Sequence, residues 1–298
     1  MHAANRAVLA FLVAVTVSIL GSPRPAVAQI DLSGEWRNVP HEDTTGRAAA
    51  TVGEFVGLPI NAAGRLKAES WDPSIHTVPE HQCIPHPMQY VEHSFAMMQM
   101  RIWKVVDPAT QQPIAFQKRG TWMEPERTIW LDGRPHPPAY APHTWQGFST
   151  GRWDGNMLTV TTTHLKSGWI QMNGVSASDR TIVTEHFARH GNYLTNITVI
   201  TDPVYLTEPF VRTSTWVLDP RLQFGPYPCG PNEIVVEIQR PPGTIPHYLP
   251  GTNPWLTEYA IQHGLPWEPT RGGADTMYPE YMERLKTMKP AAVTTTGK

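Results

Sequence analysis

The chain has 298 residues, of which 17% are charged, and a formal net charge of −2 with a pI of about 6.7. It has no cluster of Lys and Arg, so the sequence predicts neither a nucleic-acid nor an anionic-membrane partner. Its 30 Pro, 22 Gly and 11 Trp indicate many turns and flat aromatic packing, and argue against a mainly helical protein.

Residues 1–28 have the pattern of a secretory signal peptide. A basic residue near the start is followed by an apolar run from Val8 to Leu20 and by a small-residue site that ends at Ala28. The apolar run is shorter than the ~20 residues that a membrane span needs. The sequence therefore predicts a periplasmic or secreted protein that begins near Gln29 and is not attached to a membrane. A retained membrane anchor is the alternative.

Strand-like segments recur at hairpin-like spacing from Trp36 onward. We expect about eight or nine strands from the alternating and β-prone segments; beyond the one at Trp36, these cover residues 90–106, 115–122, 128–131, 156–164, 179–189, 193–201, 211–218 and 233–240. The segment 97–104 is semi-apolar on both faces, which predicts a strand buried on both sides. His190-Gly-Asn192 predicts a hairpin turn. The pattern favours an all-β antiparallel barrel or sandwich over a βαβ fold.

Helices are expected mainly near the end of the chain. A short helix is predicted over 61–70, and another over 253–264, where Asn253 is an N-cap candidate and Gly264 follows the last turn. A further helix is expected over 278–288. We therefore predict a barrel domain over 29–240, a C-terminal extension over 241–289 with short helices packed on the barrel, and a disordered tail over 290–298.

The two cysteines, Cys83 and Cys229, are predicted to form a disulfide. In an oxidising compartment an isolated pair usually does so, and a loop this long would contribute roughly 4–5 kcal/mol in the chain-entropy model. The alternative is a metal site formed by His81, Cys83 and His86. A closed zinc site needs four ligands and this motif supplies three, so the disulfide is favoured and no metal is predicted.

The side chains best suited to chemistry follow a short strand-like run in Leu131-Asp-Gly-Arg-Pro-His-Pro137. Proline after Arg134 and after His136 restricts both residues, so we expect them to be rigidly presented beside Asp132. His136 is the candidate for proton transfer and Arg134 for binding a carboxylate, while Asp132 would orient His136 or bind a substrate cation. His164, on the same predicted face as Leu158, is a fourth catalytic candidate.

Each of these residues also has a structural interpretation. Asp132 could fix a turn, Arg134 could stack on a tryptophan, and His164 could be a hydrogen-bonded core histidine. The residues proposed to line a substrate site are Tyr90, His93, Met98, His143 and Trp145. The sequence has no nucleophile elbow, Walker loop, dinucleotide fingerprint or His-Glu-x-x-His motif, so no cofactor is predicted.

Three motifs together carry a family resemblance. They are Asp31-Leu-Ser-Gly-Glu-Trp36, the 131–137 motif, and the pattern Trp-x-Gly-x-Ser-x-Gly-Arg-Trp-x-Gly-x-x-Leu-x-Val over 145–160. They resemble a large family of exported bacterial β-barrel proteins, mostly uncharacterised, over about residues 30–240. The Gly-x-Trp element resembles the entrance of lipocalin-like (calycin) barrels, in which the Trp closes one end. More loosely, the chain is similar to cofactor-free decarboxylases of lignin-derived phenolic acids.

These observations lead to three functional hypotheses. The first is an exported, cofactor-independent lyase that decarboxylates an aromatic or phenolic carboxylic acid in the barrel, with Arg134 binding the carboxylate and His136 or His164 moving a proton. The second is a periplasmic binding or carrier barrel without catalysis, because an aromatic wall serves it equally well. The third is a metal-dependent hydrolase that uses His81, His86, His136 or His143. Homo-oligomerisation is left open.

Overall fold

The computed structural model describes residues 30–40, 51–72, 85–91, 99–121, 123–223, 225 and 247–291. The chain divides into Met1–Ile30 and Asp31–Lys298, and the fold described below belongs to the second unit. The predicted signal peptide, both cysteines and the predicted strand over 233–240 lie outside the described residues. Within the described ranges, no helix has the length and apolar character needed to cross a membrane.

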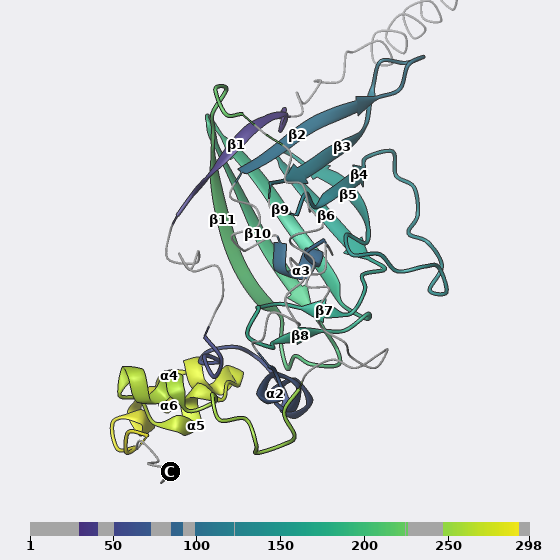
Figure 1. Ribbon diagram of the computed structural model, residues 1–298. Coiled ribbons are helices and arrows are strands. Elements are labelled where there is room, and N and C mark those ends of the chain that lie inside the picture. Colours follow the sequence, from purple (N-terminus) through teal and green to yellow (C-terminus); the bar gives the residue numbers. More distant parts are fainter. Residues whose placement is uncertain are drawn as a thin grey trace, which may run out of the picture. The chain divides into compact units, whose positions relative to one another are not determined.

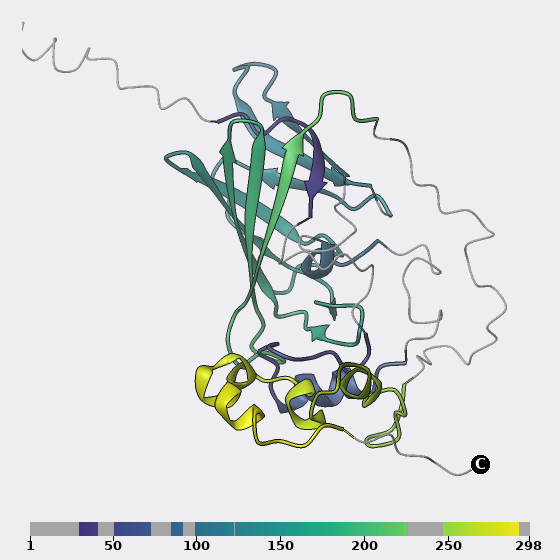
Figure 2. The same ribbon diagram turned by 90° about the vertical axis from the view of Figure 1, so that its left-hand side faces the viewer.

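Nine strands form a closed barrel (Figures 1 and 2). In chain order they are β1 (Gly34–Val39), β2 (Gln99–Val106), β3 (Pro113–Gly120), β4 (Glu126–Trp130), β5 (Phe148–Asp154), β6 (Met157–Thr163), β9 (Ile182–His190), β10 (Tyr193–Thr201) and β11 (Phe210–Leu218). Around the barrel the order is β1-β11-β10-β9-β6-β5-β4-β3-β2, so β1 closes the ring by pairing with both β11 and β2. The predicted β-barrel is therefore confirmed.

One strand pair departs from the antiparallel arrangement expected from the sequence. β4 and β5 are parallel, with Ile129 opposite Ser149 and Trp130 opposite Thr150, whereas the other neighbouring pairs of the barrel are antiparallel. The expectation was wrong because the segment 131–147 is a crossover connection, which parallel strands require. The barrel is thus mixed, and the 131–137 motif lies on its crossover.

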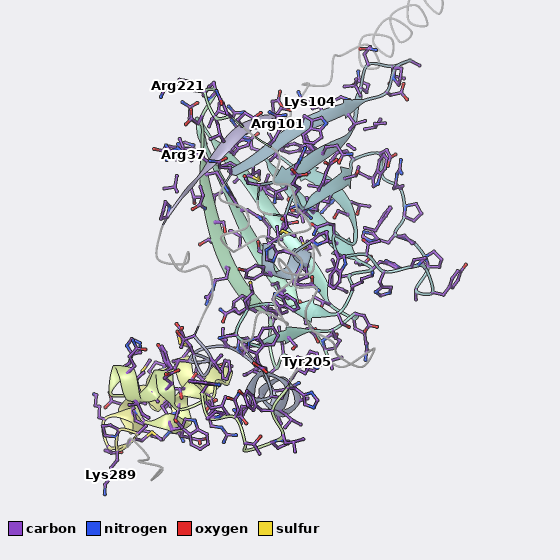
Figure 3. The ribbon with its side chains drawn as sticks, in the orientation of Figure 1. Arg37, Arg101, Lys104, Tyr205, Arg221 and Lys289 are labelled. Atoms are coloured by element: carbon purple, nitrogen blue, oxygen red, sulfur yellow. The ribbon has the colours of Figure 1, made fainter. Side chains whose placement is uncertain are left out.

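The pattern of burial along β2 also differs from the prediction. Met100 and Ile102 are buried, but Arg101 on the other face is exposed, and so is Lys104, which follows Ile102 on the same face toward the end of the strand. These two side chains pair with acidic groups of the N-terminal segment, Arg101 with Glu35 and Lys104 with Asp31. Figure 3 shows both at the end of the barrel where β1 and β2 pair. The strand is therefore not buried on both faces, because the ion pair of Arg101 lies on its outer face and that of Lys104 lies near its end.

Trp36 fills this end of the barrel. Its side chain is fully buried, and its indole Nε1 donates a hydrogen bond to the Leu32 carbonyl oxygen at 3.0 Å. The guanidinium of Arg189 lies 5.3 Å from the centre of its ring. Trp36 therefore has the position of a barrel-closing residue, while the lipocalin-like type of the barrel stays a prediction.

The opposite end is covered by short elements. They are α2 (Ala62–Glu69), α3 (Met88–Val91), β7 (Gly168–Trp169) and β8 (Ser176–Ala177). The predicted helix over 61–70 is confirmed, and its N-cap is Asn61, whose side chain accepts a hydrogen bond from the Gly64 N–H. Met88 belongs to one apolar cluster with barrel residues such as Val183 on β9 and Ile200 on β10. These elements close the end that Trp36 does not reach.

The C-terminal segment forms α4 (Glu258–His263), α5 (Trp267–Thr270), a 3-10 helix (Ala274–Met277) and α6 (Pro279–Leu285). The predicted helix over 253–264 begins late, at Glu258. The Asn253 side chain accepts a hydrogen bond from the Trp255 N–H and donates to the carbonyl oxygens of Glu69 and Trp71, so it holds a turn ahead of the helix. It ends at Gly264 with a φ of 62°, as expected. Arg271 forms an ion pair with Glu69, so these helices lie against α2 (Figure 2).

Candidate functional site

The crossover 131–147 runs outside the barrel, as the loop that connects β4 to β5 (Figure 1). His136 contacts the hydroxyl groups of Thr150 and Thr163. Their neighbours in sequence, Ser149 and Thr162, are buried. Because successive side chains of a strand point to opposite faces, Thr150 and Thr163 project outward. The imidazole of His136 is therefore outside the barrel wall.

A directed hydrogen-bond chain holds this loop. We call it the outer chain; it consists of Thr150, His136, Thr163, His164 and the Pro138 carbonyl, with successive distances of 2.8, 2.7, 2.8 and 3.0 Å. The carbonyl can only accept, so His164 Nε2 donates to it and, in the neutral ring, Nδ1 accepts from the Thr163 hydroxyl. His136 Nδ1 then donates to Thr163, and its Nε2 accepts from Thr150. Every member has a partner when both rings are neutral.

His164 leaves the strand alternation that its sequence position predicts. Continued alternation would place it on the inner face with Leu158, but β6 ends at Thr163 and His164 has a φ of 57°. This left-handed backbone turns the side chain toward the crossover. The ring of His143 lies 5.3 Å from that of His164, and its Nδ1 donates to the Leu165 carbonyl oxygen. The structure thus gathers three predicted histidines on the outer surface.

Asp132 and Arg134 form an exposed ion pair beside these histidines. Arg134 Nε lies 2.9 and 3.0 Å from the two carboxylate oxygens of Asp132, and its Nη2 lies 2.5 Å from one of them. The guanidinium carbon stacks 3.4 Å from the centre of the Trp130 ring. Hydrogen bonding to Arg134 lowers the pKa of Asp132, and the same bond raises the pKa of Arg134. These contacts match the structural alternatives: a turn carboxylate and a stacked arginine.

Lowering the pH should weaken the outer chain. Burial, and secondarily repulsion from His164, lower the pKa of His136 below its ordinary value of 6.5. The neutral ring therefore stabilises the fold above the unfolded-state pKa, and this contribution is lost as the pH falls through the lower folded-state pKa. We expect the thermal midpoint of the wild type to fall more than that of His136→Gln between about pH 7.5 and about pH 5.5.

His136→Gln is the matched control for this titration. Glutamine offers one donor and one acceptor but does not ionise. Besides the two threonines and His164, His136 faces the ring of Phe148, whose centre lies 5.5 Å away. All other ionisable groups are the same in both proteins, so only the difference between the two pH curves reports on His136. Parallel curves would contradict the role assigned to its neutral ring.

The proposed substrate-binding residues lie in several places. Tyr90 is buried on α3, with its ring centre 5.1 Å from that of His86. The backbone carbonyl of Trp145 accepts a hydrogen bond from the Met88 N–H. His93 and Met98 lie outside the described residues. Trp145 thus contacts α3 through its backbone, and the predicted catalytic and substrate-binding roles stay predictions.

A second polar group, which the sequence analysis missed, lies inside the barrel. It consists of Lys118 on β3, Arg127 on β4 and Glu185 on β9, which we call the interior cluster; their side chains are 0%, 2% and 0% exposed. Arg127 Nη2 lies 2.7 and 2.5 Å from the two Glu185 oxygens, and Lys118 Nζ lies 3.9 Å from one of them. Burying charge is costly unless it is paired, so these three groups depend on one another.

Polar and aromatic neighbours surround the interior cluster. Arg127 Nη1 donates to the hydroxyls of Ser149 and Thr162 at 3.3 and 3.2 Å. Lys118 Nζ lies 5.0 Å from the centre of the Phe187 ring and 5.9 Å from that of Trp216, distances at which a cation is attracted by aromatic faces. The arrangement places an amine, a carboxylate and aromatic rings together, away from water.

A signal for the interior cluster was present in the sequence. Glu185 lies between Val183 and Phe187 on the apolar face of β9, where both neighbours are buried. A charged residue on an otherwise apolar strand face is unusual unless it has a buried partner. The partners of Glu185 could not be identified from the sequence. Lys118 and Arg127 occupy facing positions on β3 and β4, and both strands are far from β9 along the chain.

Comparisons with protein-family models, with curated proteins and with solved structures find no match for this chain. The resemblance carried by the three sequence motifs therefore stays a prediction. Over the residues that the structure describes, no group of three His, Cys, Asp or Glu side chains is placed to hold a metal ion. The alternative site of His81, Cys83 and His86 includes two residues outside those ranges.

Proposed function

We propose that the protein is a cofactor-independent carboxy-lyase that acts on an aromatic carboxylic acid bound in the barrel interior. The observation that carries the proposal is the fully buried amine of Lys118, which lies beside Glu185 and over two aromatic rings. An ionisable group in such surroundings is a candidate for proton transfer. The motif resemblance to decarboxylases of phenolic acids points to the same reaction class.

The interior cluster has groups for each step of a decarboxylation. The bond between the carboxylate carbon and the adjacent carbon breaks, CO2 leaves, and that adjacent carbon gains one proton. In the proposal the Lys118 ammonium donates this proton, and solvent restores it with Glu185 as the relay. Arg127 holds the Glu185 carboxylate with two hydrogen bonds, and the dry interior favours loss of the charged carboxylate.

The outer chain is the competing location for the same chemistry. Arg134 already binds Asp132 and Trp130, and both ring nitrogens of His136 already have threonine partners. These contacts suit residues that hold the crossover on the barrel. The two locations make opposite predictions for variants, so one experiment distinguishes them.

We expect Lys118→Arg to lower turnover by about 10²–10⁴-fold, the range lost with a general acid. Arginine keeps the positive charge beside Glu185 but does not release a proton at neutral pH. The measurement incubates the purified protein with a panel of phenolic and biaryl carboxylic acids and follows loss of the mass of CO2 by mass spectrometry. His136→Gln is the matched variant of the outer chain and should keep wild-type turnover.

Three results would change the proposal. Loss of activity in His136→Gln with an active Lys118→Arg would move the site to the outer chain. Tight binding of an acid without any change of mass would favour the non-catalytic carrier. Activity that survives in both variants would exclude both locations. Circular dichroism at the assay temperature checks that each variant is folded.

A further inference from the structure

Asn196 has a buried acceptor that the described contacts leave unused. Its side chain projects from β10 into the barrel and is fully buried. Its Nδ2 donates to Glu185 Oε1 at 3.0 Å and to Thr198 Oγ1 at 3.2 Å. Its Oδ1 has no hydrogen-bond partner among the described residues. A buried acceptor without a donor is destabilising, so a ligand that donates to this oxygen would be favoured.

Rotating the amide does not remove the problem. If the two ends exchanged places, Oδ1 would face the carboxylate oxygens of Glu185, which accept hydrogen bonds from Arg127. Two acceptors would then oppose each other. The observed orientation is therefore set by Glu185, and the carbonyl end of Asn196 is left without a donor among the described residues.

An aromatic side chain and a cationic amine lie in the layer of the barrel around Asn196. Across the sheet it pairs with Phe187 on β9 and with Ser214 on β11. The Phe187 ring also faces the amine of Lys118. A flat acid that packs beside these rings would have a cationic amine near it and one unused acceptor within the same layer of the barrel.

We propose that Asn196 is a specificity-determining residue that accepts a hydrogen bond from a ring hydroxyl of the ligand. The preferred ligand is thus a hydroxylated aromatic acid, selected over acids of the same shape that cannot donate. This rests on the proposed function in one respect, since both place the ligand in the barrel interior. The selection works because a ligand without the donor leaves Asn196 Oδ1 buried and unpaired.

Isothermal titration calorimetry with three matched acids tests this proposal. Para-hydroxycinnamic acid donates a hydrogen bond, para-methoxycinnamic acid keeps the oxygen without its proton, and cinnamic acid lacks both. We expect the hydroxylated acid to bind about tenfold or more tightly than the other two, the factor that corresponds to one buried hydrogen bond. In Asn196→Leu this preference should disappear, with all three acids binding about equally.

Thr198→Val is the matched control. It removes the hydroxyl that Asn196 contacts but leaves Oδ1 of Asn196 in place, so the preference for the hydroxylated acid should persist. Equal affinities in the wild type, a preference that survives Asn196→Leu, or no binding of any of the three acids would overturn the proposal. The wild-type comparison decides the matter even if Asn196→Leu fails to fold.

Failure of the proposed function gives a different result. If the hydroxylated acid binds preferentially and is recovered unchanged, Asn196 accepts a hydrogen bond from the ligand but the protein is a non-catalytic carrier. The lyase proposal is then wrong. If acids lose CO2 but bind with no preference for the hydroxyl, the lyase proposal holds and the role of Asn196 is wrong. Calorimetry and mass spectrometry therefore separate the two.

Discussion

Replacing Arg127 by methionine should lower the free energy of unfolding by about 3–5 kcal/mol, the cost of removing one partner from a buried ion pair. Arg127 holds both oxygens of Glu185 inside the barrel. Methionine fills much of the same volume, so the loss reports mainly on charge and not on a cavity. Urea unfolding followed by tryptophan fluorescence measures the difference.

The same variant should recover part of its lost stability at lower pH. Without Arg127, Glu185 keeps only Lys118 as a cationic partner, at 3.9 Å from one of its oxygens, and protonation of the carboxylate then relieves the poorly compensated buried charge. The penalty is therefore full at neutral pH and shrinks as the pH falls. Arg134→Met, which breaks the exposed pair with Asp132, is the control and should unfold almost like the wild type. Equal losses in the two variants would show that the interior cluster is solvated.

Replacing Trp36 by alanine should cost about 3–5 kcal/mol, the range for a large aromatic side chain lost from a core. Trp36 is fully buried on the strand that closes the barrel, where it pairs with Leu218 on one side and Met100 on the other. The cavity would lie at the seam between the first and last strands. Thermal and urea unfolding both measure the effect.

Two further variants separate packing from hydrogen bonding at this position. Trp36→Phe keeps an aromatic ring but loses the bond from Nε1 to the Leu32 carbonyl, so its loss should lie between those of wild type and Trp36→Ala. Trp255→Ala removes a tryptophan that is 42% exposed and should cost much less. A loss in Trp36→Ala no larger than that in Trp255→Ala would contradict the assignment of Trp36 to the barrel seam.

Local signals in the sequence predicted the parts of the fold that depend on neighbouring residues. The hairpin between β9 and β10 follows from His190-Gly-Asn192, where Gly191 has a φ of 59° and His190 pairs with Tyr193. The N-cap Asn61 likewise marks the start of α2. In both cases the contacts join residues that are close in the sequence, so the turn and the helix start can be predicted without knowing the rest of the structure.

Features that depend on distant contacts were not predictable in the same way. The parallel pairing of β4 and β5 requires the path of the whole crossover 131–147. The outward position of His164 depends on one backbone angle at the end of β6. The motif around His136 was found because it is rich in polar and proline residues. That composition did not show whether the motif lies inside or outside the barrel.

The interior cluster illustrates the same limit for the candidate site. Lys118 and Glu185 lie on β3 and β9, which are not neighbours in the barrel. Their approach depends on how the closed sheet brings opposite walls together. A sequence pattern can show that each charge lies on an inward face, but only the strand order shows that the charges meet.

The seam between β1 and β11 has a consequence for how the chain folds. Asn38 donates a hydrogen bond to the Thr215 carbonyl, a partner 177 positions away along the sequence. Contacts of such long range form late and slow folding, because the chain loses the entropy of the intervening segment first. A chain that stops before Phe210 would leave one free edge on β1 and another on β10. Partial synthesis or cleavage before β11 thus creates an aggregation-prone open sheet.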